Sequence, residues 1–428
     1  MSRSLRIALV VPNDKYEFEN ERHCRLKALR SACKAGDIDL VVFPEGYRRD
    51  EDRDGIQTVA DEWADRLGVP SIVGVGTGDG FQAAVYRNPT PAAGDTTSHV
   101  YVKHSTSDKV AFQWVDDQRK RQAMFEPIVL KGRKIAVQIC HDMFFGLIGQ
   151  RMRKAGADVF IDITGGGVNL RKWTNVIQGR SLELTSPFLC TMAKRGNDGS
   201  GASQAIAFHS GRCLKAGTRN VGSKGFGGYE VYTLPAGLFP GEGELAPDDQ
   251  AFTDKRYGDI TVAVDSPKSA DVQIESSSGA VRVGKKQVVP SSAWCGLEKP
   301  VGRVGVLALP LSALSDGLAL YKRIPEQGAF SHHVVTYCAA EASDSFEDLL
   351  ALAKLRAIEH RIAVVLVAGG HRAVLKTNRY KNIQRFKEAD GVFGLNAEFL
   401  GGTWSTASST PRMGIPEEFF PSYLSLAT

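Results

Sequence analysis

The chain has 428 residues, 43% hydrophobic and 24% charged, which is an ordinary composition for a globular protein but long for a single core. Its formal net charge of +5, from 53 basic and 48 acidic residues, is too small to indicate a nucleic-acid partner or an anionic membrane surface. No run approaches 18 apolar residues, and the seven cysteines are too sparse for a disulfide framework. We therefore expect a cytoplasmic protein of two domains.

Strand and helix patterns alternate at the start of the chain. Strands are predicted over 5–11, 38–43 and 71–76, and helices over 20–34 and 55–67. Mostly strands follow, at 82–86, 98–103, 134–139, 158–163, 188–193, 203–208 and 260–264, with helices at 146–155 and 173–184. Alternation followed by consecutive strands predicts a layered α/β sandwich with mixed sheets.

A Gly/Pro-rich stretch over 234–249 reads as a long loop, and we expect strand 260–264 to close the first domain. This gives a first domain over 1–266 and a smaller α/β domain over 267–428, whose role is unknown and for which regulation or partner binding is one hypothesis. The second domain is predicted to contain strands at 305–309, 333–337, 362–367 and 392–395, a helix that opens at Ser345 and another over 379–389. No internal repeat is visible in the sequence.

Three predicted strands of the first domain end at residues that can take part in covalent catalysis. One run leads through Phe43 and Pro44 to Glu45, a second ends at Lys103, and a third ends at Cys140. A single strand-end cysteine is more often inert packing, and Glu45 or Lys103 alone could be an ordinary turn or surface residue. All three at the carboxyl ends of strands, where α/β folds place their chemistry, fit one mechanism.

Together they supply a nucleophile, a cation and a base. Lys103 would lower the pKa of the Cys140 thiol and share an oxyanion with a backbone N–H, for which His141 is the candidate. Glu45 would accept the thiol proton, pass it to the leaving amine and later activate water against a thioester. Gly165, in a glycine-rich segment after a strand, could present another N–H to the substrate, although such a segment is more often a flexible turn. This chemistry requires no cofactor and no metal.

The arrangement resembles the carbon–nitrogen hydrolase (nitrilase) superfamily over about residues 5–275. The matching segments are Phe43-Pro44-Glu45, Tyr101-Val102-Lys103-His104, Ile139-Cys140-His141-Asp142, Arg180-Ser181-Leu182-Glu183, Gly201-Ala202-Ser203-Gln204-Ala205-Ile206 and His209-Ser210-Gly211-Arg212. The resemblance implies a four-layer α-β-β-α sandwich, a Glu-Lys-Cys triad and homo-oligomers of two or more subunits. It also implies a small amide, carbamoyl or nitrile substrate, with amides commoner than nitriles. No nucleic acid and no membrane is expected as a partner.

The sequence departs from the family at one position. Many members carry a second glutamate between the lysine and the cysteine, and here Asp117 is the candidate for a shortened substitute, because Glu126 lies too close to the cysteine. Two alternative functions stay open. One is a catalytically silent, nitrilase-like scaffold or binding protein. The other is an ammonia-supplying glutaminase domain, which the lack of a recognisable ATP-binding glycine loop in 267–428 disfavours.

Overall fold

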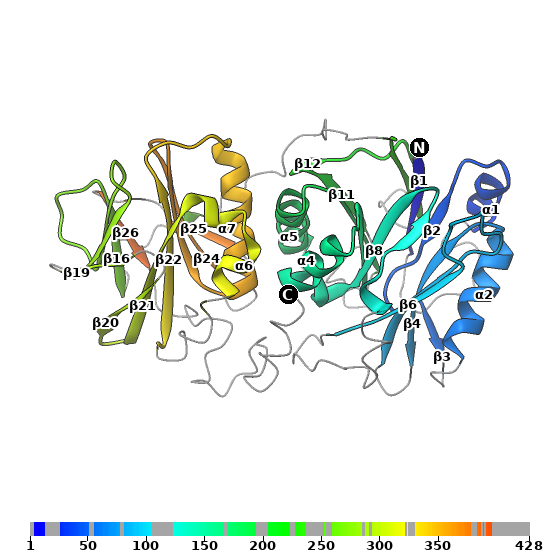
Figure 1. Ribbon diagram of the computed structural model, residues 1–428, viewed down its shortest axis with the longest axis horizontal. Coiled ribbons are helices and arrows are strands. Elements are labelled where there is room, and N and C mark those ends of the chain that lie inside the picture. The colour runs from blue at the N-terminus through cyan, green and yellow to red at the C-terminus, as the bar shows by residue number, and fades with distance from the viewer. Residues whose placement is uncertain are drawn as a thin grey trace. The chain divides into compact units, whose positions relative to one another are not determined.

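The structure is a computed structural model. It describes residues 4–12, 26–50, 55–77, 81–104, 123–165, 170–193, 204–222, 227–236, 252–253, 259–284, 287–290, 293–321, 323, 330–377, 383–386, 388 and 391–395. These residues form two compact units, with everything up to Ala236 in the first and everything from Phe252 on in the second. Each unit is described by itself (Figure 1).

The first unit contains two mixed sheets. The first sheet has the order β13 (Thr218–Asn220), β14 (Gly228–Leu234), β1 (Leu5–Val11), β2 (Leu40–Val42), β4 (Ser71–Thr77), β5 (Gln82–Arg87) and β6 (Ser98–Val102), with β3 (Arg48–Asp50) beside β4. The second has the order β12 (Arg212–Cys213), β11 (Gln204–His209), β10 (Pro187–Ala193), β9 (Val159–Gly165), β8 (Arg133–Ile139) and β7 (Ile128–Leu130). They face each other through the contacts of β1 with β10 and of β5 with β8.

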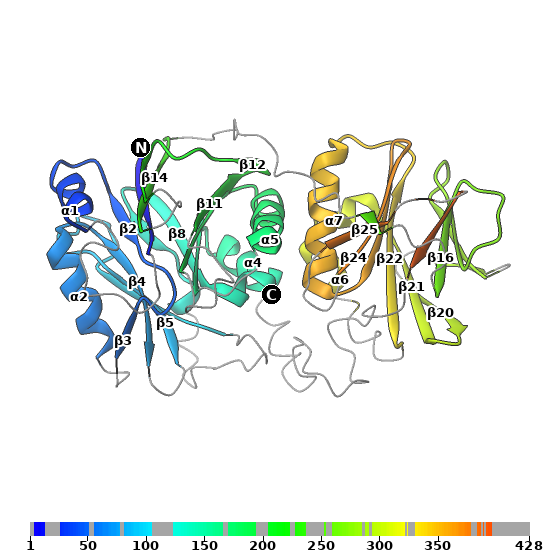
Figure 2. The same cartoon turned by 180° about the vertical axis from the view of Figure 1, so that it is seen from behind.

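Helices cover both outer faces of this pair of sheets (Figures 1 and 2). Helices α1 (Leu26–Lys34) and α2 (Ile56–Leu67) pack on the first sheet, and α4 (Gly146–Lys154) and α5 (Leu170–Glu183) lie on the side of the second. Helix α2 shows why: its apolar residues recur every three or four positions, so that one face is buried, and it ends at Gly68 with φ of +71°. The predicted four-layer α-β-β-α sandwich is confirmed for this unit.

The second unit also contains two sheets. Its larger sheet has the order β15 (Phe252–Thr253), β25 (Ile383–Phe386), β24 (His371–Thr377), β23 (Ala363–Ala368), β22 (His332–Ala339), β21 (Gly302–Pro310) and β20 (Trp294–Lys299). The smaller has the order β19 (Gln287–Val288), β18 (Ala280–Val283), β17 (Val272–Glu275), β16 (Ile260–Val264) and β26 (Val392–Leu395). A shared apolar core joins the two sheets, and α7 (Phe346–His360) packs on the other face of the larger one (Figure 2).

Two predictions for the chain after residue 236 are wrong. Strand 260–264 does not close the first domain, because as β16 it pairs with β17 and β26 of the second unit. The boundary therefore lies before this strand and not at residue 266. The predicted helix over 379–389 contains strand β25 instead, antiparallel to β24. Ile383 and Phe386 are three residues apart, which puts them on opposite faces of a strand, and Phe386 enters the core between the sheets.

Candidate active site

Glu45 lies just after β2, in a buried turn, and its carboxylate is held at both oxygens. Lys103 Nζ donates to Oε1 at 2.6 Å, and the backbone N–H of Gly165 donates to Oε2 at 2.6 Å. The turn fits because Gly74 of β4 has no side chain. A Cβ there would lie 2.2 Å from the Pro44 carbonyl oxygen and 2.7 Å from Glu45 Cα. Close packing of this turn on β4 therefore fixes the carboxylate.

Lys103 directly follows β6, and its backbone N–H continues the β-hairpin by donating to the carbonyl of Gln82 at 2.9 Å. The hairpin thus aims the ammonium at Glu45. The side chains of Lys103 and Glu45 are only 11% and 8% exposed, so their ion pair is largely shielded from water. Such a pair is costly to break from one side, because the remaining charge stays buried.

Cys140 is the first residue after β8 and opens a 3-10 turn, Cys140–Phe144. Its φ of +55° lies in the left-handed region, which is unusual for a residue with a side chain and costs about 1–3 kcal/mol. This backbone presents the buried thiol at the end of the strand. The sulfur lies 3.3 Å from Nδ1 of His141, and the charges of Glu45 and Lys103 both act on its pKa. The turn therefore brings the third predicted residue to the other two.

Asp142 ties the cysteine turn to the lysine strand. Its fully buried carboxylate accepts the Tyr101 hydroxyl at 2.9 Å and the His104 backbone N–H at 3.1 Å. Tyr101 and His104 flank Lys103, so one carboxylate aligns the segments that carry the thiol and the ammonium. The sequence placed Asp142 in a family motif without a role, and its contacts show what it does.

Arg180 holds the same turn from the opposite side. This buried residue of α5 donates through Nε to the Met143 carbonyl at 2.8 Å and through Nη2 to the Phe144 carbonyl at 3.1 Å. Its Nη1 is paired with Glu183 at 2.5 Å, one helical turn on. The last carbonyls of the 3-10 turn are thereby satisfied by a guanidinium whose charge is balanced within the helix.

The electrostatics of the three residues differ from the sequence-based expectation in one respect. Burial would lower the pKa of Lys103, but the charges of Cys140 and Glu45 outweigh it and raise that pKa, so the ammonium is retained. Burial, followed by the Glu45 charge, raises the pKa of the Cys140 thiol, although Lys103 acts to lower it. Lys103 thus lowers the thiol pKa as expected, but burial and Glu45 outweigh it and the net shift is upward. The resting sulfur keeps its proton, and a base must remove it during reaction.

The remaining site predictions fare differently. The N–H of Gly165 is donated to Glu45, so in this state it positions the base and does not face the substrate. The His141 ring stacks on Phe144 at 5.4 Å between ring centres and meets Trp173 edge-on at 5.4 Å, which makes it part of an aromatic wall beside the sulfur. Asp117 lies outside the described residues, and its proposed role stays a prediction.

Comparisons with known proteins were made by sequence and by structure. No family model matches the chain, and no curated protein sequence matches it. By structure it is similar to a carbon–nitrogen hydrolase from Helicobacter pylori G27, at 14% identity and TM-score 0.42 over 54% of this chain and 89% of that one. It is also similar to Nit3 of Saccharomyces cerevisiae, a nitrilase superfamily member of branch 10, at 15% identity and TM-score 0.41 over 56% and 92%.

A third similar structure is an amidase from Nesterenkonia sp., at 15% identity and TM-score 0.39 over 55% of this chain and 91% of that one. Just over half of this chain is covered in each comparison, and the likeness is one of fold. Within the described part of the chain, no helix is long and apolar enough to cross a membrane. Nor does that part contain a cluster of three or more histidine, cysteine, aspartate or glutamate side chains that could hold a metal ion.

Proposed function

We propose that the first unit hydrolyses a non-peptide C–N bond in a small amide, carbamoyl or nitrile substrate through a thioester on Cys140. The observation that carries this proposal is the position of Glu45. Its carboxylate is fixed by Lys103 and Gly165 at 2.6 Å each, and its charge acts on the Cys140 thiol. A base, a cation and a nucleophile from three strand ends thus belong to one site, which is the arrangement that acyl transfer to sulfur needs.

For an amide, the reaction begins as Glu45 takes the thiol proton while the Cys140 sulfur attacks the carbonyl carbon. The C=O π bond opens, and the oxyanion is stabilised by the Lys103 ammonium and a backbone N–H, for which His141 is the candidate. Glu45 then gives its proton to the nitrogen as the C–N bond breaks. The products of this half-reaction are ammonia or an amine and a thioester on Cys140.

The second half-reaction uses the same carboxylate. Glu45 removes a proton from a water molecule as the water oxygen attacks the thioester carbon, and the C–S bond then breaks. The proton returns to the sulfur, a carboxylic acid leaves, and Glu45 is again ionised. The raised pKa of Cys140 suits this cycle, because sulfur is neutral between turnovers and needs the carboxylate at each step.

Ammonia release from a panel of small aliphatic and aromatic amides tests the proposal. The wild type should release ammonia from at least one amide, and Cys140→Ala should release none above background. Cys33→Ala is the matched control, since Cys33 is also a buried thiol but sits on helix α1. Activity of Cys140→Ala equal to that of wild type would contradict the thioester route. A wild type that hydrolyses no amide, carbamoyl compound or nitrile would favour a catalytically silent scaffold.

A further inference from the structure

Six of the seven strands in the larger sheet of the second unit repeat the second sheet of the first unit, and the seventh, β15, has no counterpart among the described strands. In the first unit the sheet begins with an antiparallel hairpin, continues through two parallel pairs and ends with two antiparallel pairs, over β7, β8, β9, β10, β11 and β12. In the second unit the same pairings recur, in the same chain order, over β20, β21, β22, β23, β24 and β25. Each of these sheets also has its long helix, α5 or α7, between the third and fourth strands.

The smaller sheet continues the correspondence. In each unit the first strand of this sheet in chain order, β1 or β16, pairs antiparallel with the last, β14 or β26. In each unit an antiparallel meander follows, over β4, β5 and β6 or over β17, β18 and β19. The difference lies between the first strand and the meander. The first unit has α1, β2, β3 and α2 there, whereas residues 265–271 lead directly from β16 to β17.

A buried arginine makes the same contacts in both units. Arg180 of α5 pairs through Nη1 with Glu183 at 2.5 Å, and Arg356 of α7 pairs through Nη1 with Glu359 at 2.5 Å. The Nε of Arg180 donates to the carbonyl of Met143, the fourth residue of the 3-10 turn after β8. The Nε of Arg356 donates to the carbonyl of Leu314, the fourth residue of the 3-10 turn (Leu311–Leu314) after β21. Unrelated folds have no reason to share this arrangement of atoms.

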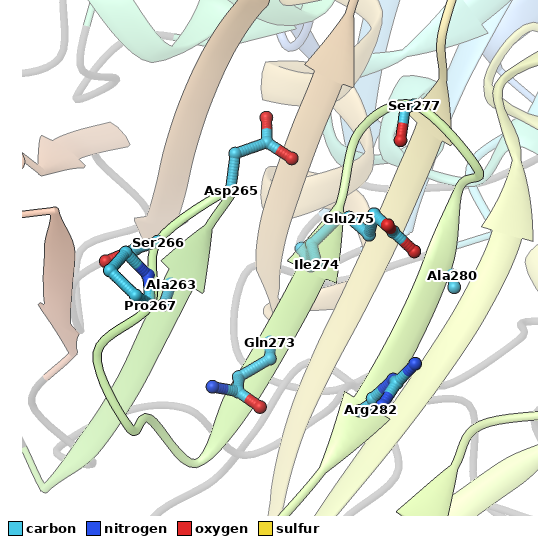
Figure 3. A pocket seen from close by; sticks show the side chains of 10 residues that line it. All are labelled: Ala263, Asp265, Ser266, Pro267, Gln273, Ile274, Glu275, Ser277, Ala280 and Arg282. Carbon is cyan, nitrogen blue, oxygen red and sulfur yellow. The ribbon is translucent and has the colours of Figure 1, made fainter.

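Within the described part of the chain, no helix replaces α1 and α2 on the outer face of the smaller sheet. In the first unit, Val73 on this face packs under α2 beside Trp63. In the second unit, the face carries Gln273 and Arg282 side by side on neighbouring strands (Figure 3). They line an open pocket of about 510 Å³ together with Ser266, Ser277 and other residues of this face. The polar side chains match the loss of the helices, as they must for a sheet face in contact with water.

The catalytic positions of this second copy are occupied by residues without the required chemistry. Leu311 opens the turn after β21, where Cys140 opens the turn after β8, and unlike Cys140 it has no positive φ. Val289 follows the meander, as Lys103 does, and its N–H likewise donates back across the hairpin, to Val281 at 2.8 Å. The strand that would deliver the glutamate is missing.

We infer that the second unit is a shortened, non-catalytic copy of the sandwich of the first, so that the described part of the chain contains one reactive centre. The two copies share their strand order and a buried Arg–Glu pair. Because little else is common to their residues, the sequence shows no repeat. The correspondence of the units rests on strand pairing and the arginine contacts. The inference that the second unit lacks catalytic residues rests also on the proposed function of Glu45, Lys103 and Cys140.

Hydrogen exchange tests the correspondence without reference to activity. Glu183→Gln and Glu359→Gln are matched, isosteric changes. Each removes the carboxylate charge that pairs with the buried arginine of its unit and so weakens the contacts of that arginine with the turn. In the full-length protein each should speed amide exchange by about fivefold or more in its own turn, 141–145 or 312–316, which is the scale of one lost hydrogen bond. Glu359→Gln should leave 141–145 unchanged. If exchange in 312–316 did not respond, the shared role of the two arginines, and with it the repeat, would be wrong.

A cysteine introduced at the corresponding turn tests whether the second unit lacks a catalytic site. Leu311→Cys in a Cys140→Ala background puts a cysteine at the corresponding turn, but without a lysine or a glutamate to serve it. The variant should show no ammonia release above the Cys140→Ala parent on any amide that the wild type hydrolyses. Restored release would overturn the inference. A wild type without activity would count against the proposed function instead, and the exchange experiment would still decide whether the second unit is a copy.

Discussion

Lys103 and Glu45, 58 residues apart in the chain, form an ion pair of 2.6 Å in which neither side chain is more than 11% exposed. Two strand ends meet in this pair, and its carboxylate charge acts on the thiol at the end of a third strand. The pair therefore links the fold to the proposed chemistry, and its loss should be visible in both stability and turnover.

Removing the Lys103 ammonium should deprive the Glu45 carboxylate of the positive charge that pairs with it. We expect Lys103→Met to lower the free energy of unfolding by about 3–5 kcal/mol, because the buried Glu45 charge loses the cation that balances it. The double variant Lys103→Met, Glu45→Gln should recover part of that loss, since no charge then remains to be desolvated. Denaturant midpoints of the four proteins in this cycle give the coupling. A double variant less stable than Lys103→Met would contradict the pairing.

The thiol should titrate above its ordinary range. Because burial and Glu45 raise the pKa of Cys140, the rate of its alkylation by iodoacetamide should keep rising through about pH 9 and reach no plateau near neutrality. Glu45→Gln should shift this profile to lower pH, since the carboxylate charge contributes to the upward shift. Mass spectrometry of the Cys140 peptide measures both rates. A wild-type plateau below pH 8 would mean that the Lys103 cation prevails over burial.

The same shift predicts a pH dependence of stability. The folded pKa of Cys140 is raised above its unfolded value, so this thiol contributes stability that is fully present below the unfolded pKa and is lost as pH rises through the folded one. The unfolding free energy of the wild type minus that of Cys140→Ser should therefore fall above about pH 9. Equilibrium unfolding at several pH values measures it. A difference that grew with pH would reverse the sign of the shift.

Asp142 should act through position and not through chemistry. Asp142→Ala removes the carboxylate that accepts from the Tyr101 hydroxyl and the His104 N–H, so we expect a loss of about 2–5 kcal/mol in stability together with a fall in kcat. Tyr101→Phe removes one donor and keeps the carboxylate on His104, and it should cost about 1–2 kcal/mol. Thermal unfolding and ammonia release, read together, separate the two. Equal effects of both variants would show that the His104 contact contributes nothing.

Gly74 should tolerate no side chain. A methyl group at this position would lie 2.2 Å from the Pro44 carbonyl oxygen, so Gly74→Ala must push the Glu45 turn away from β4. We expect a loss of about 1–3 kcal/mol in stability and of most ammonia release. Gly68→Ala is the control: Gly68 also belongs to the first unit and its φ of +71° makes an added side chain strained, but no neighbouring atom lies within 4 Å of the added methyl. Comparable losses of turnover in both variants would remove the link to Glu45.

The sequence was sufficient for the parts of the site that lie at strand ends. Apolar runs that stop at Glu45, Lys103 and Cys140 are visible in the sequence, because a buried strand is a continuous apolar run and each of these residues marks its end. The contacts of Asp142 and of the Gly165 N–H were not visible, since they join segments 38 and 120 residues apart in the chain and leave no periodic trace. The sign of the thiol shift also depends on burial, which only the packed structure gives.

The second unit was harder to predict for a similar reason. Strand β16 looks in sequence like a closing strand of the first domain, and only its pairing with β26, more than a hundred residues later, assigns it to the second. Short strands such as β18 and β19 are too brief to show alternation, and the repeat lies in their order. The helix that opens at Ser345 was readable because its cap is local: Ser345 Oγ accepts the Asp348 N–H at 3.2 Å.

The central claim is that carbon–nitrogen bond cleavage passes through an acyl group on the Cys140 sulfur. Rapid acid quench of the enzyme during turnover of an amide, followed by peptide mapping, tests this directly. The peptide that contains Cys140 should gain the mass of the acyl group, the gain should disappear on treatment with hydroxylamine, and Cys140→Ala should show none. Ammonia release with an unmodified Cys140 peptide, or with the acyl group on another residue, would contradict the account.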